Sequence, residues 1–377
     1  MVSVKHTFSY DPAEMDNAVE SHFSLLRLDE LLRPGMKVTV KPNLLLKRRP
    51  EEGTTTHPEL VAAIIRRLRK AGVTDITVAD SPGGPYTVSQ LTGIYRASGM
   101  EKAAEENGAV LNFNVGSTET PSRNGVISPS FPIITPIAEA DLVISVCKLK
   151  SHCMAGLSGG VKNLFGCIPG LTKPDYHWRY PKEEDFCSML VDLCETVRPA
   201  ITFCDAVMSM EGDGPSGGDL RQTNMTLCSL SPYELDLALC RVIGREEDDI
   251  LTIRAAKERS ICRETFAELE LCGDELLLYP DFKRPRTASL DFVSSVPAFL
   301  RPVVRPIVRT FLTTRPHIDR KKCIGCGKCA ESCPAHTIRI EKGKARIDRA
   351  ACIRCYCCHE MCPIRAIEVK QNPLLRL

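Results

Sequence analysis

The chain has 377 residues, of which 43% are apolar, and a formal net charge of +2, which suits one large core and a second, small domain. No stretch approaches the ~18 apolar residues that span a bilayer and the first ten residues have no apolar secretory core, so we expect a cytoplasmic protein without a transmembrane segment. The basic residues lack interleaved aromatic side chains and a known reader motif, which argues against nucleic acid as a partner.

Between Lys37 and about Ser229, β-branched runs alternate with amphipathic segments. We expect strands at residues 38–40, 76–79, 110–113, 142–146 and 201–204. We expect helices at residues 58–70, 100–106, 183–197 and 232–243. This alternation predicts an α/β fold over residues 1–296, with a mainly parallel sheet and flanking helices.

Polar side chains follow four of the expected strands. They are Asn43, Asp80, Lys148, Lys150, His152, Asp205 and Glu211. The ligand crevice of an open α/β sheet lies beyond the carboxyl ends of its strands, so these residues could face one cleft. Each Asp or Asn alone is better explained as a turn or cap residue, but the repetition at four strand ends favours a cleft.

A glycine-rich segment runs over residues 148–170. Its glycines, among them Gly159 and Gly160, permit close backbone approach, and exposed amides beside Lys162 would suit an anionic or phosphate-bearing ligand. The segment lacks the ending of a P-loop, and no G-x-G-x-x-G follows a strand, so neither nucleoside-triphosphate nor Rossmann dinucleotide binding is expected. A second glycine-rich stretch, 210–218, could form the opposite lip; flexible loops without a ligand are the alternative.

Six short motifs of this region carry a family resemblance. They are Lys41-Pro42-Asn43, Thr56-His57-Pro58-Glu59, Ala79-Asp80-Ser81-Pro82-Gly83, Lys148-Leu149-Lys150-Ser151-His152, Gly159-Gly160-Val161-Lys162-Asn163 and Met210-Glu211-Gly212. Over roughly residues 30 to 270 the chain resembles the domain-of-unknown-function 362 family, which is often fused to a ferredoxin module. The resemblance implies no established reaction.

Three cysteines, Cys147, Cys153 and Cys167, lie around the same glycine-rich segment. A third metal site or a nucleophilic Cys153 beside His152 is conceivable. The spacings match no usual site, so buried structural thiols are favoured. Beyond them, the Pro- and Arg-rich segment 297–316 predicts a semi-rigid spacer, with a docking or membrane-surface helix as the alternative.

The pattern C-x2-C-x2-C-x3-C-P occurs twice near the C-terminus and predicts two 4Fe-4S clusters. In this pattern the fourth cysteine of each run binds the other cluster. One cluster is therefore expected on Cys323, Cys326, Cys329 and Cys362, and the other on Cys352, Cys355, Cys358 and Cys333. Zinc knuckles are the alternative, but they rarely carry a third cysteine at this spacing. Cys357 breaks the spacing and is expected not to bind a cluster.

Residues 317–377 resemble a bacterial-type two-cluster ferredoxin domain, a small α+β unit with short strands at residues 337–340 and 366–369. This segment contains thirteen Lys or Arg against six Asp or Glu. Such a basic surface would attract an acidic external redox protein, such as a free ferredoxin or flavodoxin. A solvated surface without a partner is nearly as well supported.

Together these features suggest an iron–sulfur oxidoreductase of anaerobic metabolism, which relays electrons between an external carrier and an anionic small-molecule ligand in the α/β domain. Lys150 and Lys162 would bind the ligand, while His152 and Asp80 would move protons. The residues expected to position the ligand or a cofactor are Asn43, Gly159, Gly160, Asn163, Asp205 and Glu211. A flavin or deazaflavin could convert one-electron to two-electron chemistry. The alternatives are a non-catalytic electron carrier or docking subunit, and a non-redox enzyme with structural clusters.

Overall fold

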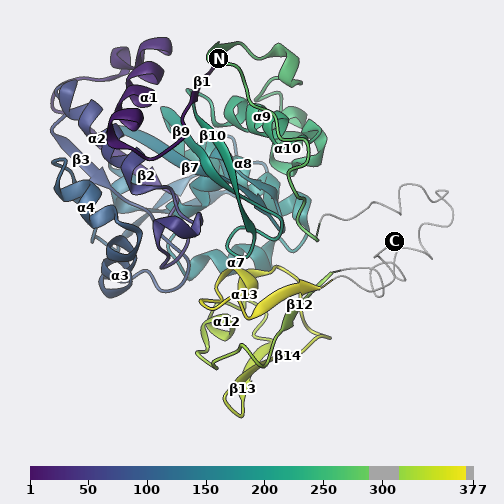
Figure 1. The fold of residues 1–377 in the computed structure, drawn as a ribbon. Helices are drawn as coiled ribbons and strands as arrows, with labels where there is room; N and C mark the ends of the chain where they lie inside the picture. The colour runs from purple at the N-terminus through teal and green to yellow at the C-terminus, as the bar shows by residue number, and fades with distance from the viewer. Residues whose placement is uncertain (288–313, 371–377) are drawn as a thin grey trace.

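The structure is a computed structural model that describes residues 1–287 and 314–370. A large α/β domain and a small C-terminal domain are visible in Figure 1. The expected spacer, 297–316, lies almost wholly outside the described residues. The small domain begins with strand β12 (Arg315–Ile318), two residues before the expected boundary.

The large domain is built on one mixed sheet whose strand order is β11-β1-β10-β9-β7-β2-β3-β4, with β8 beside β7. The strands are β1 (Val2–His6), β2 (Lys37–Pro42), β3 (Asp75–Val78), β4 (Val110–Leu111), β7 (Leu142–His152), β8 (Gly156–Ser158), β9 (Ile201–Glu211), β10 (Asp219–Ser229) and β11 (Leu271–Gly273). Strands β9, β7, β2, β3 and β4 are parallel, whereas β10 is antiparallel to both β9 and β1. The predicted mainly parallel sheet is confirmed, and β1 and β10 are additions that the pattern did not reveal.

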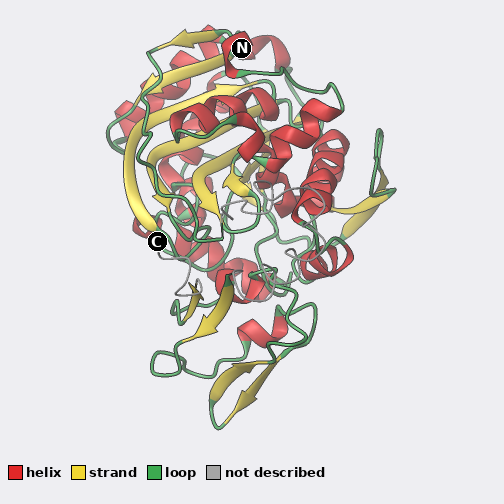
Figure 2. Cartoon of the chain, turned by 90° about the vertical axis from the view of Figure 1, so that its right-hand side faces the viewer, coloured by secondary structure: helices red, strands yellow, loops and turns green. Residues whose placement is uncertain are grey.

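Helices cover both faces of this sheet, which lies between them in Figure 1 and is viewed through the helices of one face in Figure 2. One face carries α1 (Pro12–Leu25), α2 (Pro58–Lys70), α3 (Val88–Ser98) and α4 (Met100–Glu105). The other carries α6 (Gly160–Asn163), α7 (Thr172–Arg179), α8 (Glu183–Val197), α9 (Pro232–Val242) and α10 (Leu251–Glu258). Strand residues alternate between the two cores: Ile144 packs with α1 and α2, and Cys147 with α9. Successive side chains of a strand point to opposite faces, so a sheet with two covered faces contributes residues to both cores.

Shorter elements join these layers. They are η1 (Leu28–Leu31), η2 (Pro50–Glu52), β5 (Ser117–Pro121), β6 (Ser130–Ile134), α5 (Thr135–Ala138), η3 (Leu164–Cys167), η4 (Glu247–Asp249) and η5 (Phe266–Glu268). Strands β5 and β6 form a separate hairpin. No helix in the described part of the chain is long and apolar enough to cross a membrane.

Helices α2 and α8 begin and end at the predicted residues, because local signals define their ends. In α2 the side chain of His57 accepts a hydrogen bond from the Glu59 amide, and Pro58 occupies the first turn. Basic residues in its last turn favour the helix C-terminus. Capping signals of this kind depend only on neighbouring residues, and the sequence therefore reveals them.

Strands β7 and β9 continue well past their predicted ends at residues 146 and 204. Lys148, Lys150 and His152 therefore lie within β7, and Asp205 and Glu211 within β9, rather than in loops after the strands. The strands can continue because Lys148 stands opposite Asp205 in the pairing and its ammonium binds that carboxylate at 2.8 Å. Likewise, the segment 148–170 is not one loop, since it contains the end of β7, β8, α6 and η3.

The small domain consists of two antiparallel strand pairs and two short helices. Strand β12 pairs with β15 (Ile367–Lys370), and β13 (Ile338–Glu341) pairs with β14 (Lys344–Ile347). The helices are α12 (Lys328–Glu331) and α13 (Cys357–Glu360). Both predicted short strands are present, each displaced by one residue. Helix α13 faces the large domain, whereas the β13–β14 hairpin lies at the far end (Figure 1).

Candidate functional site

A cavity of about 80 Å³ lies where the carboxyl ends of β2 and β3 meet the small domain. Its large-domain wall includes Lys41, Asn43, Asp80, Lys162, Asn163, Lys173 and His177. Its small-domain wall is Ser332, Cys357, Glu360 and Met361. The cavity is thus at the sheet edge where α/β folds bind ligands, and helix α13 closes it.

A buried ion pair forms the floor of this cavity. The ammonium of Lys41 lies 2.7 Å from Asp80 Oδ1, and Asp80 Oδ2 accepts a hydrogen bond from the Leu44 amide at 2.9 Å. A side chain at Gly166 would intrude here, because its Cβ would lie 2.1 Å from Asp80 Oδ1. Lys41 and Asp80 thus neutralise each other at the floor, and Gly166 leaves the space that they occupy.

Lys162 contributes a positive charge with no direct partner. It lies on α6, and its ammonium makes no hydrogen bond and no ion pair with any described residue. The Phe165 ring centroid is 5.8 Å away. Burial lowers the pKa of Lys162, and the negative charge of Glu360 opposes that shift. An ammonium that lines a cavity without a counter-ion is suited to bind an anion.

Two further lysines near the cavity are held by neutral oxygens only. Lys173 donates to the Ser81 carbonyl at 2.5 Å, and Lys150 donates to Asn43 Oδ1 at 2.9 Å and to the Thr54 carbonyl at 2.7 Å. Burial lowers the pKa of each to about 7, and the charge of Lys162 contributes to the shift of Lys150. Amines with such pKa values can exchange protons at neutral pH.

A direct contact links the two domains beside the cavity. His152 Nε2 lies 3.1 Å from Glu360 Oε1. His152 Nδ1 accepts hydrogen bonds from the amides of Met154 and Ala155 at 3.0 and 3.1 Å, which places the proton of a neutral ring on Nε2. Burial lowers the pKa of His152 to about 4, so the ring is neutral at pH 7 and its Nε2 proton lies beside the Glu360 carboxylate without the alignment of a hydrogen bond.

His177 is a second buried histidine, and it lines the cavity itself. Its ring stacks on Phe186 with centroids 4.3 Å apart, and Nδ1 has no hydrogen-bond partner among the described residues. Sequence reasoning missed both His177 and Lys173. Their i, i+4 spacing just after the glycine-rich segment was a usable signal, because it puts both on one face of α7.

Four of the predicted ligand-positioning residues lie elsewhere. The amides of Gly160 and Val161 donate to the buried carboxylate of Asp236 at 2.6 and 3.2 Å, and a Cβ on Gly159 would clash with that carboxylate. Asp205 binds Lys148 and the Tyr10 hydroxyl, and Glu211 binds Lys283.

None of these four residues lines the cavity. Of the predicted set, the structure gathers Asn43, Asp80, Lys162 and Asn163 around the cavity. Lys150 and His152 lie directly behind it.

The fourth motif cysteines, Cys362 and Cys333, each lie near thiols of the other run. Burial, followed by the nearby thiols Cys326, Cys362 and Cys323, raises the pKa of Cys329 to about 11. Burial also raises the pKa of Cys352, whose thiol neighbours are Cys355 and Cys333. The two ligand sets are the prediction of the motif, in which each fourth cysteine binds the other cluster.

The surroundings of these thiols fit iron–sulfur clusters. Backbone amides of Ala366, Ala345 and Thr337 donate to the sulfurs of Cys362, Cys323 and Cys333 at 3.1, 3.4 and 3.4 Å. Such hydrogen bonds stabilise cluster thiolates. Within residues 1–287 and 314–370, no three His, Cys, Asp or Glu side chains converge closely enough for a single ion. A cubane does not require that, because each thiolate binds a separate iron.

The remaining cysteines are free thiols. Cys147, Cys153 and Cys167 are buried, and burial raises the pKa of Cys167 to about 12. These values fit inert structural thiols. Cys357 differs, because it lines the interdomain cavity.

The fold and the thiol arrangement define an α/β protein fused to a two-cluster iron–sulfur domain. Residues 315–363, which contain all eight motif cysteines, match the 4Fe-4S dicluster domain. This match supports iron–sulfur electron transfer. Residues 38–241 match the family described as "Domain of unknown function (DUF362)". The chain belongs to this family.

A curated relative supports the same membership. A thylakoid-associated protein from Synechocystis sp. (strain ATCC 27184 / PCC 6803 / Kazusa) is 31% identical over 288 residues, which are 70% of this chain and 84% of the relative.

Among solved structures, lactate racemase apoprotein from Thermoanaerobacterium thermosaccharolyticum aligns with a TM-score of 0.41 and 16% identity, over 65% of this chain and 57% of that one. A structural-genomics protein from Thermotoga maritima aligns with a TM-score of 0.34 and 14% identity, over 55% and 53%. The chain therefore spans less than two thirds of either structure.

Proposed function

We propose that this protein is an oxidoreductase that moves electrons between an external one-electron carrier and a small anionic ligand in the interdomain cavity. One observation carries the proposal: helix α13, which contains Cys358 and leads into Cys362, forms a wall of the cavity whose opposite wall holds Lys162. A bound ligand would lie directly beside the cluster-binding turn. When bound to the motif cysteines, the two clusters supply or accept electrons one at a time.

The residues around the cavity can divide the remaining tasks. Lys162 would bind the anion by charge, because its ammonium makes no ion pair with any described residue. Lys173 would exchange a proton with the ligand, since its pKa is about 7. Asp80 would hold Lys41 in place through their ion pair, and Asn43 would connect the ligand to Lys150 through its side-chain oxygen.

The dimensions of the cavity limit the ligand. Sites for drug-sized molecules usually measure several hundred Å³, whereas this cavity measures about 80 Å³. A flavin or deazaflavin is larger than this space, so the proposal does not include one. A compact carboxylate or a similar small anion fits both the volume and the charge.

The cysteines indicate the compartment of the protein, and the charge of the small domain indicates its external carrier. None of the nineteen cysteines, all of which lie in the described residues, forms a disulfide, which suits a reducing compartment such as the cytoplasm of an organism that lives with little oxygen. The basic small domain suits an acidic carrier such as a ferredoxin or flavodoxin.

The test is mass spectrometry of small molecules released from protein that is purified without oxygen. We expect one small anion to accompany the wild-type protein and to be at least about tenfold depleted from Lys162→Met, because the substitution keeps the stem but removes the charge. The matched control is Lys182→Met, which removes a charge from an exposed position. Cluster absorbance should be the same in all three proteins.

Two results would contradict the proposal. One is an anion that is retained equally by Lys162→Met and the wild-type protein. The other is the lack of any small molecule enriched in wild-type protein, which would favour a plain electron carrier.

A further inference from the structure

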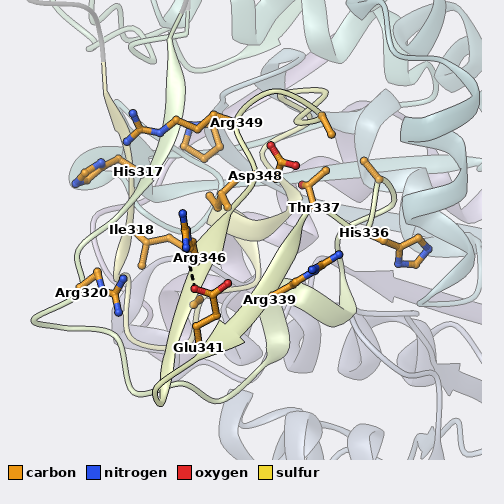
Figure 3. A pocket seen from close by; sticks show the side chains of 15 residues that line it. His317, Ile318, Arg320, His336, Thr337, Arg339, Glu341, Arg346, Asp348 and Arg349 are labelled. Atoms are coloured by element: carbon orange, nitrogen blue, oxygen red, sulfur yellow. Dashed lines mark hydrogen bonds and ion pairs between the residues drawn. The ribbon is translucent and has the colours of Figure 1, made fainter.

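The small domain has a second and larger cavity, of about 800 Å³, on β12, the β13–β14 hairpin and segment 348–351. We name it the hairpin groove. Its basic lining residues are His317, Arg320, His336, Arg339, Arg346 and Arg349 (Figure 3). The groove shares no lining residue with the interdomain cavity.

The hairpin groove keeps a net positive charge, because four arginines line it against two carboxylates, Glu341 and Asp348. Glu341 pairs with Arg346 at 3.0 Å, and in Figure 3 Arg320 and Arg339 stand on either side of this pair. Among the described residues, Arg320, Arg339 and Arg349 have neither an ion pair nor a side-chain hydrogen bond. Several exposed guanidinium groups around one concave surface attract carboxylates, which they can bind through two parallel hydrogen bonds.

The floor of the groove is in direct contact with both sets of thiols. Ala345, a lining residue, donates its amide to Cys323 Sγ at 3.4 Å. Thr337, another lining residue, donates its amide to Cys333 Sγ at 3.4 Å. A protein seated in the groove would thus be separated from one thiol of each predicted cluster by little more than the hairpin backbone.

The groove and the interdomain cavity are built on different elements of the small domain. Helix α13 faces the large domain, whereas the β13–β14 hairpin is at the opposite end (Figures 1 and 2). A partner in the groove would therefore leave the cavity accessible to its own ligand. This arrangement suits electron transfer between a protein in the groove and a ligand in the cavity.

We propose that the hairpin groove docks a small acidic electron-carrier protein through carboxylates on its surface. The inference rests on the proposed function and specifies where its external partner binds. A groove of this volume, with arginines spread along it, suits several carboxylates at once, as on a protein surface, more than one small anion. Because the groove lies over the cluster-binding thiols, we expect the acidic protein that binds there to be an electron carrier.

Isothermal titration calorimetry tests this docking. Full-length protein with reconstituted clusters is titrated with a small acidic two-cluster ferredoxin, and both proteins are kept oxidised so that the heat reports binding alone. For Arg339→Glu/Arg349→Glu we expect the Kd to rise at least about tenfold at low ionic strength, because two attractive charges become repulsive. At high ionic strength the difference from wild type should shrink.

The matched control is Arg33→Glu/Arg123→Glu. It changes the net charge equally, and both arginines are exposed on the large domain without an ion pair in the described structure. Equal weakening by both double variants would overturn the proposal, since net charge alone would explain binding. An unchanged Kd in the groove variant would also overturn it. So would a wild-type dimer in sedimentation that the groove variant dissociates, because a second copy would then occupy the groove.

This titration separates the docking site from the cavity. Binding of the carrier requires neither the cavity ligand nor turnover, so Lys162→Met should bind the ferredoxin as the wild type does. If Lys162→Met retained the small anion while Arg339→Glu/Arg349→Glu lost the carrier, the proposed cavity function would fail and the docking site would stand. The reverse pair of results would refute the docking site alone.

Discussion

At the scale of single residues, the protein treats its buried cations in two ways. Lys41 and Lys148 each have a carboxylate at 2.7 to 2.8 Å, whereas Lys150 and Lys173 are held by neutral oxygens and have pKa values near 7. An ammonium without a carboxylate is costly to bury, so such lysines tend to occur where a charge or proton is used. The two lysines without a carboxylate lie at the interdomain cavity or directly behind it, whereas Lys148 does not line it.

Buried histidines make the folded protein less stable as the pH falls. His22 lies between Ser3 Oγ at 2.6 Å and Thr226 Oγ1 at 3.0 Å, and burial lowers its pKa to about 3. The unfolded chain takes up this proton below pH 6.5 but the folded chain does not, so stability falls as the pH drops from 6.5 toward 3.

We expect His22→Gln to be less stable at pH 7, by about 1–2 kcal/mol, because its hydrogen bonds are replaced imperfectly. Below pH 6.5, however, the variant should lose stability less steeply, by about 1.4 kcal/mol per pH unit. Urea unfolding from pH 7 to pH 4.5 measures this difference. His6→Gln serves as control, because His6 is part-exposed. If the free energy of unfolding of His22→Gln and of the wild type changed in parallel with pH, His22 would not be the source of the acid sensitivity.

At the scale of elements, a turn of the large domain holds helix α13. Ser216 donates to the Glu360 carbonyl at 2.9 Å, and His359 Nε2 lies 3.0 Å from the Asp213 carbonyl. Gly217 allows this approach, because a Cβ at that position would lie 2.6 Å from His359 Cε1. The His359 ring cannot easily move away, since Nδ1 is also held, 2.6 Å from the Ile367 carbonyl.

We expect Gly217→Val to loosen the contact between the two domains without unfolding either one. Hydrogen exchange should accelerate in residues 213–218 and in α13, while β7 and β9 keep their protection. Gly93→Ala in α3 is the control, because its nearest contact would be a tolerable 3.8 Å. Unchanged exchange in α13 of Gly217→Val would show that the contact adapts freely.

At the scale of the whole molecule, each domain has its own main core, and the domains meet through polar contacts and a small apolar cluster of Cys153, Tyr356 and Val369. Half of the ten buried residues of the small-domain core are cysteines that belong to the two motifs, and the other half are Ile and Ala. Polar contacts between the domains include Arg48 to the Cys362 carbonyl at 3.2 Å and His152 to Glu360. The small domain therefore depends on what its cysteines bind, while the large domain does not.

We expect removal of iron to unfold the small domain selectively. A small core in which half of the buried residues are thiols loses much of its cohesion when the clusters are absent. After anaerobic chelation, hydrogen exchange should lose protection in β12 to β15 and retain it in β2, β7 and β9. Reconstitution to about eight irons per chain should restore it. Full protection of β12 to β15 in iron-free protein would contradict this dependence.

The sequence by itself determined the features that depend on neighbouring residues. The two cysteine runs predict a 4Fe-4S dicluster domain, because the spacing dictates which sulfurs one loop can present, and the family match agrees. Helices α2 and α8 were predicted to the residue because their end signals are local: His57 caps α2, and acidic residues occupy the first turn of α8. The α/β class followed from alternating apolar patterns, although two strands escaped notice. Strand β1 pairs with the distant β10, and the first half of β10, which pairs with the preceding β9, is mostly exposed and polar.

Only the tertiary structure decided which polar residues share a site. Glycines and carboxylates that look alike in the sequence have different partners in the fold. The Gly160 amide donates to Asp236, and Asp205 forms an ion pair with Lys148, so neither group faces the cavity. Helix α13, from the far end of the chain, closes the cavity around Lys162. Such contacts depend on long-range packing and not on local pattern, so neither the cavity nor the hairpin groove could be located before the chain was folded.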